Sequence, residues 1–245
     1  MKSAKSVFLT GLLVASCLPF PLLAQERRSF THTVDYRPGR EDALLEIFKP
    51  ISEKFENDYR ALGAAYTAGE ILYRQKRYDD SIKNFESVIN RGKKYPYLVD
   101  SAKLRMAQSL ILLGADEEAL KTARDVAGSN NKFLSAEAWF TLSRGYLAKA
   151  RIDRAEDAFK NTLTVNPVYG DLLKVDLLAG LISFEKGNYL DAASHFQRHN
   201  NDIPSLYYAI ACFCQMKDIG KAVASYQKLL SNAKKGIWVD RARIL

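Results

Sequence analysis

The sequence predicts an all-α fold, a solenoid of about five helical hairpins, and three observations support it. A small residue recurs at spacings of 38, 36, 37 and 30, where each second helix would pack on the first: Ser81, Ala119, Ala155, Ala192 and Ala222. An aromatic residue follows four positions later in every hairpin except the second: Phe85, Phe159, Phe196 and Tyr226. Glycine and proline are sparse, at 13 and 7 of 245 residues, which suits long helices.

Residues 1–24 have the pattern of a secretory signal peptide. A basic start is followed by a long apolar run, and the chain turns polar at Gln25. We therefore predict export to the periplasm with cleavage after Ala24. An alternative is a lipobox-like tetrapeptide that ends at Cys17, in which this cysteine would carry lipid and anchor the protein to the outer membrane.

The following segment, residues 25–41, is polar and is predicted to be a flexible lead-in. The helical array is then predicted to span residues 42–232. Its first part consists of a short helix over residues 44–48, which Pro50 should break because proline lacks a backbone N–H. A long helical pattern follows over residues 51–75.

Residues 136–167 show the pattern of a single hairpin most clearly. Apolar and small residues fall at steps of three and four in two stripes, with a break at residues 151–153 and a stop at Pro167. The residues that set this register are Trp139, Leu142, Tyr146, Ala155 and Phe159. Their spacing resembles the tetratricopeptide repeat (TPR) family, with Ser143 in place of the usual glycine.

The resemblance implies stacked hairpins whose concave wall is built mainly from the first helices, and a non-catalytic role in binding other proteins. The Tyr95–Pro96 junction is similar to those of bacterial envelope TPR proteins, such as the outer-membrane barrel-assembly lipoprotein and the Tol-associated cell-division coordinator. After the array, residues 233–245 read as the start of another helix or as a cap.

The net charge is +8, and +6 without the two lysines of the signal segment. Basic residues cluster where predicted helices end, and acidic residues cluster where they begin. This placement complements the helix dipoles, at about 0.3–1 kcal/mol for each charge. We therefore predict no nucleic-acid partner, and membrane contact only if Cys17 is lipidated.

The residues that could carry chemistry are few. His195 and His199 are spaced as two zinc ligands on one helix face would be, but the intervening glutamate of a metalloprotease helix is missing, and Phe196 should turn both outward. Cys212 and Cys214 are two residues apart on one predicted helix, so they point in directions too different to be bridged easily. We predict no catalytic residue, no metal site and no cofactor, and therefore no enzyme.

The TPR register instead selects a partner-binding wall on the first helices. Its predicted members are Tyr66, Glu70, Tyr73, Arg74, Gln108, Phe140, Arg144, Leu181, Phe184 and Tyr207. Aromatic residues and arginine dominate binding hot spots, so the wall is expected to hold a peptide or helix of another envelope protein. Contacts between adjacent repeats are the alternative role for each residue. A carbohydrate-binding helper that stacks sugars on Tyr66, Tyr73, Phe140 and Tyr207 is a further alternative.

Overall fold

A computed structural model describes residues 39–54, 58–114, 116–171, 173–233 and 235–245. In this part of the chain it contains twelve α-helices and one 3₁₀ helix, and consecutive helices pack side by side from α2 to α6 and from α8 to α13. The predicted all-α hairpin fold is confirmed. The helices form two compact units that divide between Gly145 and Tyr146. The predicted signal segment, Cys17 and nearly all of the lead-in lie outside the described residues.

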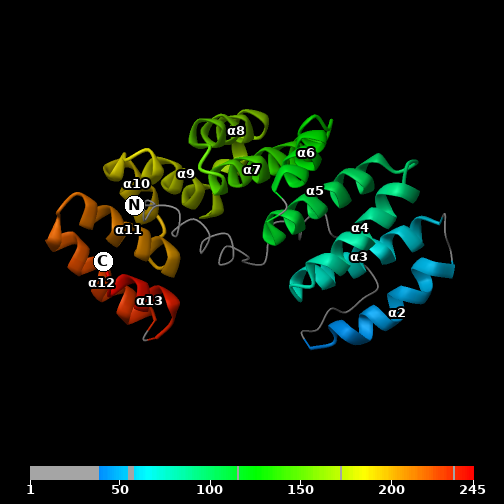
Figure 1. Cartoon of the computed structure of the whole chain (residues 1–245), viewed down its shortest axis with the longest axis horizontal. Coiled ribbons are helices and arrows are strands. Elements are labelled where there is room, and N and C mark those ends of the chain that lie inside the picture. The colour runs from blue at the N-terminus through cyan, green and yellow to red at the C-terminus, as the bar shows by residue number, and fades with distance from the viewer. Residues whose placement is uncertain (1–38, 55–57, 115, 172, 234) are drawn as a thin grey trace. The chain divides into compact units, whose positions relative to one another are not determined.

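The N-terminal unit covers residues 39–145. Its helices are α2 (Glu41–Lys54), α3 (Tyr59–Arg74), α4 (Tyr78–Arg91), α5 (Pro96–Leu113), α6 (Asp116–Ala127) and all but the last turn of α7 (Lys132–Ala148). From α2 to α6, each helix lies beside the next (Figure 1). The main core gathers around Phe85 and Val88 of α4, which pack on Leu62 of α3 and Leu98 of α5.

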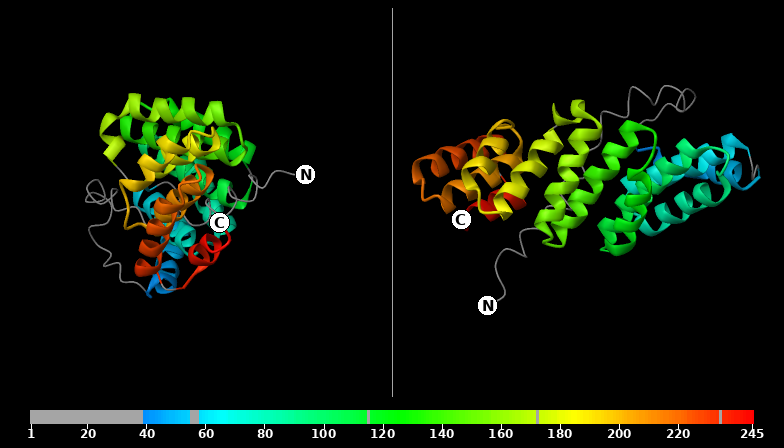
Figure 2. Two further views of the ribbon diagram at one scale, coloured as in Figure 1. Left: turned by 90° about the vertical axis from the view of Figure 1, so that its left-hand side faces the viewer. Right: turned by 90° about the horizontal axis from the view of Figure 1, so that it is seen from above.

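The C-terminal unit covers residues 146–245. Its helices are α8 (Ile152–Val165), the 3₁₀ helix η3 (Pro167–Asp171), α9 (Leu173–Glu185), α10 (Tyr189–Gln197), α11 (Ile203–Gln215), α12 (Ile219–Asn232) and α13 (Ile237–Ala242). Successive helices again lie side by side, from α8 in yellow-green to α13 in red (Figure 2). Figure 2 also shows the short α13 at the end of this unit, where it packs on α11 and α12.

The five small residues that predicted the repeat are all buried, which confirms their role in helix packing. In the first hairpin the Ser81 hydroxyl donates to the Gly69 carbonyl at 2.9 Å. Four residues after Ser81, the Phe85 ring lies against Gly69, where a Cβ would come within 2.7 Å of it. Gly180 and Phe196 repeat this contact in the fourth hairpin, at 2.6 Å.

The turn inside each hairpin contains one residue with left-handed backbone, always five positions before the small packing residue. These residues are Lys76, Gly114, Ala150, Gly187 and Lys217, with φ between 54° and 83°. In four of the turns the next residue donates its N–H to a carbonyl five positions back at 2.9 Å, as Arg151 does to Tyr146. This pattern is the Schellman motif, which favours glycine at the left-handed position. Three of the five turns adopt it without glycine.

The prediction that Pro50 breaks the first helix is wrong, because α2 continues through it to Lys54. Proline inside a helix removes one hydrogen bond and costs about 3 kcal/mol. Here α2 buries Phe48, and packs Leu44, Leu45 and Ile51, against Ala64, Ala68 and Ile71 of α3. That packing lies on both sides of the proline, so it offsets the cost. The long helix predicted from residue 51 begins instead at Tyr59, where the Asp58 carboxylate caps α3.

The connections after the second, third and fourth hairpins fall close to their predicted places. Asn131 caps α7, Pro167 opens η3, and Pro204 lies in the first turn of α11. The spacing of only 30 residues between Ala192 and Ala222 allowed for a shortened helix in the fourth hairpin, and α10 indeed has only nine residues. None of the helices in the described residues is long and apolar enough to cross a membrane.

Candidate functional site

The predicted wall residues of the N-terminal unit gather on neighbouring helices. We call this surface the α3–α5 face. It is formed by Tyr66, Tyr73 and Arg74 of α3 and Tyr97 of α5, over a layer made of Glu70 of α3 with Arg105 and Gln108 of α5. Arg74 and Tyr97 are exposed, and Tyr66, Glu70 and Tyr73 are half-buried. The face therefore presents aromatic and charged groups over a buried polar layer.

An ion pair with one hydrogen bond ties the two helices together beneath this face. Arg105 Nε lies 2.6 Å from Glu70 Oε1, and Arg105 Nη2 donates to Glu70 Oε2 at 3.1 Å. The Arg105 guanidinium also lies 5.8 Å from the centre of the Tyr73 ring, on which it acts as a cation–π partner. A charge-assisted hydrogen bond of this kind fixes the position of the two side chains, so it holds the aromatic residues above it in place.

The pKa shifts reflect this packing. Burial raises the pKa of Tyr66, and the Glu70 carboxylate raises it further while Arg105 opposes both. Burial on its own would lower the pKa of Arg105, but Glu70 together with Tyr66, Tyr73 and Glu137 outweighs it and raises the pKa overall. Both groups therefore keep their ordinary protonation states, a neutral phenol and a charged guanidinium, at physiological pH.

The polar layer continues from α5 to α7. Arg105 Nη1 donates to Gln108 Oε1 at 3.0 Å, and Gln108 Nε2 donates to Glu137 Oε1 and Thr141 Oγ1 at 3.3 Å each. All four side chains are buried. The first helices of three successive hairpins are thus joined by one polar network.

Several predicted wall residues are buried. Gln108 is 5% exposed and belongs to the network, and Phe140 is only 3% exposed. In the C-terminal unit Leu181 is 7% exposed, and Tyr207 is 1% exposed because its ring packs on those of Tyr208 and Trp238. These four side chains offer no exposed surface, since neighbouring side chains cover them. Arg144 and Phe184 are half-buried, and the Phe184 ring contacts Tyr189 and Tyr208 edge-on.

The two histidines do not point outward as predicted. His195 Nδ1 lies 3.0 Å from Asp176 Oδ1, and His199 Nε2 lies 2.9 Å from Asp176 Oδ2. Arg198 Nη1 donates to the same Oδ1 at 2.7 Å. The sequence search missed Asp176 because it stands on α9, at the register position that Trp139 occupies in the preceding hairpin. The carboxylate that replaces the aromatic ring there is satisfied by His195 of α10 and by Arg198 and His199, which follow the end of α10.

The two cysteines of α11 are free thiols, Cys212 buried and Cys214 half-buried. Burial raises the pKa of the Cys212 thiol to about 12. A thiol with so high a pKa is a poor nucleophile, so Cys212 is a packing residue.

Arg105, Glu137 and Tyr97 are the members of the site that sequence reasoning missed. A signal for Arg105 exists, because it is the one charged residue in the otherwise uncharged stretch from Leu104 to Leu113. A single charge within a long apolar stretch implies a buried partner. The partner, Glu70, lies 35 positions earlier and was identified only as a wall residue.

No protein-family model matches the chain, and no curated protein matches it. Several solved structures are similar to it. A TPR protein from Parabacteroides merdae is 16% identical, covers 98% of this chain and 85% of its own, and has a TM-score of 0.67. A thermophilic TPR protein from Thermus thermophilus is 20% identical, covers 76% of this chain and 100% of its own, and has a TM-score of 0.61. At these identities the likeness shows a TPR fold.

A third similar structure is YrrB, described as a TPR protein with an unusual peptide-binding site. It is 14% identical, covers 82% of this chain and 100% of its own, and has a TM-score of 0.54.

Proposed function

We propose that this chain is a non-catalytic scaffold of the bacterial envelope, which binds a peptide or helix of another envelope protein on the α3–α5 face. The observation that carries the proposal is the buried Arg105–Glu70 ion pair beneath a surface of tyrosines and arginine. Tyrosine and arginine are enriched in binding hot spots. A face that is held rigid before binding loses less entropy when a partner docks.

The TPR fold supports this reading, because YrrB, which shares it, has a peptide-binding site. The carbohydrate-binding alternative loses support. Two of its four stacking residues, Phe140 and Tyr207, are buried at 3% and 1% exposure and offer no ring face to a sugar.

Binding is tested by affinity purification from crosslinked envelope extracts. We compare the wild type with Arg74→Glu, which reverses an exposed charge of the face, and with Lys121→Glu, which makes the same charge change on an exposed position of α6. We expect Arg74→Glu to lose the principal partner and Lys121→Glu to keep it. If both folded variants retain every partner, the α3–α5 face is not the binding surface. Phe140→Ala is unsuitable as a probe, since truncating a buried phenylalanine costs about 3–5 kcal/mol.

The envelope location rests on the N-terminal sequence, and we propose cleavage after Ala24. The basic start, the apolar run and the polar switch at Gln25 support it. A lipid anchor on Cys17, as in an outer-membrane assembly factor, is the alternative. Mass spectrometry of the mature protein separates the two. An N-terminal Gln25 excludes the anchor, whereas a lipidated Cys17 overturns the cleavage site.

A further inference from the structure

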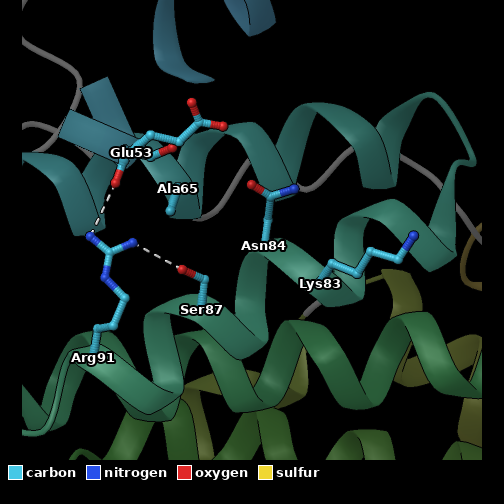
Figure 3. A pocket seen from close by; sticks show the side chains of 7 residues that line it. Glu53, Ala65, Lys83, Asn84, Ser87 and Arg91 are labelled. Atoms are coloured by element: carbon cyan, nitrogen blue, oxygen red, sulfur yellow. Dashed lines mark hydrogen bonds between the residues drawn. The ribbon is translucent and has the colours of Figure 1, made fainter. Parts of the chain in front are cut away.

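A second site lies in the N-terminal unit and shares no residue with the α3–α5 face. A hollow of about 410 Å³ opens between α2, α3 and α4 (Figure 3). It is lined by Ser52 and Glu53 of α2, Ala65 of α3, and Lys83, Asn84, Ser87 and Arg91 of α4. Every lining residue except Ala65 is polar or charged. The methyl group of Ala65 is too small to fill the space between the helices.

Helix α4 supplies a polar stripe along the hollow. Lys83, Ser87 and Arg91 are spaced four residues apart, so they share one side of the helix over about 12 Å. Figure 3 shows Ser87 and Arg91 pointing from α4 toward Ala65 and Glu53, whereas Lys83 extends the other way along α4, at the far end of the hollow. Arg91 Nη1 donates to Ser87 Oγ at 3.0 Å, and its Nη2 donates to the Ser52 carbonyl at 3.1 Å. Arg91 thereby holds α2 against α4 and keeps the hollow open.

Lys83 and Asn84 supply the groups that a ligand would meet. The Lys83 side chain is 73% exposed and lies 3.4 Å from Asp80 Oδ1. Such exposed pairs contribute little stability, so the ammonium group is free to turn to another anion. Asn84 Nδ2 donates to the Asp80 carbonyl at 2.9 Å, which orients the amide. Its oxygen lies on the side of Ala65, where it can accept a peptide N–H (Figure 3).

We propose that this hollow binds an acidic peptide segment. Lysine and arginine side chains at its two ends favour carboxylates, while the asparagine between them accepts from the peptide backbone. In an extended peptide, residues four apart point to the same side and lie about 13 Å apart. This matches the length of the α4 stripe. Two acidic residues four positions apart are therefore the preferred pattern, with the first carboxylate on Lys83 and the second at the Arg91 end.

Glu53, on the opposite wall of the hollow, provides a second test of the proposal. Its carboxylate repels an acidic ligand, so it lowers affinity without preventing binding. Removing that charge by Glu53→Gln should strengthen the binding of an acidic peptide, whereas Lys83→Glu should weaken it. The two variants alter opposite walls of the same hollow with opposite predicted signs.

The test measures fluorescence anisotropy with labelled glycine–serine peptides. One probe carries two glutamates four residues apart, and the matched probe carries glutamines at the same positions. We expect the glutamate probe to bind at least about tenfold more tightly, and Lys83→Glu to weaken it by about tenfold. Glu53→Gln should tighten binding, and Lys121→Glu and Arg74→Glu should leave it unchanged. Circular dichroism of each variant confirms folding.

Four results overturn the proposal. The two probes could bind equally, or the glutamate probe could fail to saturate the protein up to about 1 mM. Lys83→Glu and Lys121→Glu could weaken binding equally, which would indicate attraction by net charge alone. Loss of binding with Arg74→Glu but not Lys83→Glu would place the peptide on the α3–α5 face instead. Because different variants test the hollow and the α3–α5 face, the proposal for one site can be disproved without disproving the other.

Discussion

Arg105 Nε lies 2.6 Å from Glu70 Oε1, and the two side chains are only 7% and 15% exposed, so a buried ion pair joins the first helices of successive hairpins. Such pairs often add little net stability compared with apolar residues, but removing one partner leaves a buried charge unpaired. The pair therefore contributes chiefly to fixing the register of α3 on α5. The tyrosines of the α3–α5 face depend on that register.

Truncating this arginine should destabilise the protein strongly. We expect Arg105→Ala to lower the free energy of unfolding by about 3–5 kcal/mol, because it strands the Glu70 carboxylate and opens the Gln108 network. Glu70→Gln combined with Arg105→Met should lose much less, since the Glu70 carboxylate is no longer left buried without a cation, and Glu137 keeps its hydrogen bond from Gln108. Urea denaturation of the two variants measures both. Equal losses would mean that packing volume, and not charge, accounts for the effect.

A glycine at the turn of the third hairpin should stabilise the protein. Ala150 has φ of 54°, where an L-residue is strained by about 1–2 kcal/mol. Ala150→Gly relieves that strain but raises the conformational entropy of the unfolded chain. We expect the free energy of unfolding to rise by about 0.5–1 kcal/mol. Ala148→Gly, two residues earlier in helical backbone, should instead cost about 1 kcal/mol. Thermal unfolding that gives both substitutions the same sign would contradict the turn geometry.

Adding one methyl group at Gly69 should destabilise the first hairpin. A Cβ there would lie 2.7 Å from the Phe85 ring, which is fully buried and cannot move aside. Overpacking of about 1–3 kcal/mol outweighs the better helix propensity of alanine, about 1 kcal/mol. Gly220→Ala in α12 is the control, because its nearest neighbour would lie at 3.8 Å. Denaturation midpoints should fall for Gly69→Ala and stay level or rise for Gly220→Ala.

Acid should weaken the α9–α10 contact through Asp176. Burial by itself raises the pKa of this carboxyl group, but hydrogen bonds from His195 and His199 and the charge of Arg198 lower it overall, below its usual 3.8. A carboxylate with a lowered folded pKa contributes stability above its unfolded pKa and loses it as the pH falls through the folded value. The contribution is therefore complete above about pH 4 and lost below it.

Unfolding measured from neutral pH downward should show this loss in the wild type. Asp176→Asn should be less stable than the wild type at neutral pH, and the difference should shrink below about pH 4. Asp157→Asn, an exposed position of α8, serves as the control and should follow the wild type. A constant gap between wild type and Asp176→Asn across this range would contradict the role of the carboxylate.

Most of the fold could be predicted from local sequence patterns. The helix pairing was readable because Ser81, Ala119, Ala155, Ala192 and Ala222 must be small for two helices to approach closely. The predicted helix break at Pro50 was wrong, because the packing of Phe48 against α3 outweighs the free-energy cost of proline inside a helix. No local sequence pattern reveals that contact. The left-handed turns at Lys76 and Lys217 could not be predicted from the sequence, because lysine shows no preference for the left-handed backbone that it adopts there.

The site was less predictable than the fold, because it depends on pairs that are distant in sequence. The repeat register identifies which positions lie on the first helices, but it does not say which of them are buried. Phe140 and Tyr207 are covered, whereas Arg74 remains exposed. The Asp176 cluster likewise requires two helices to be placed before its charges can be matched.

Site-specific photocrosslinking in cells tests the central claim most directly. A photoreactive amino acid replaces Arg74 or Tyr97 on the α3–α5 face, and in a separate strain it replaces Lys121 on α6, all exposed positions. We predict that a discrete partner protein is crosslinked from positions 74 and 97 and not from 121. Crosslinks to the same protein from position 121 alone, or none from either face position in a folded protein, would contradict the account.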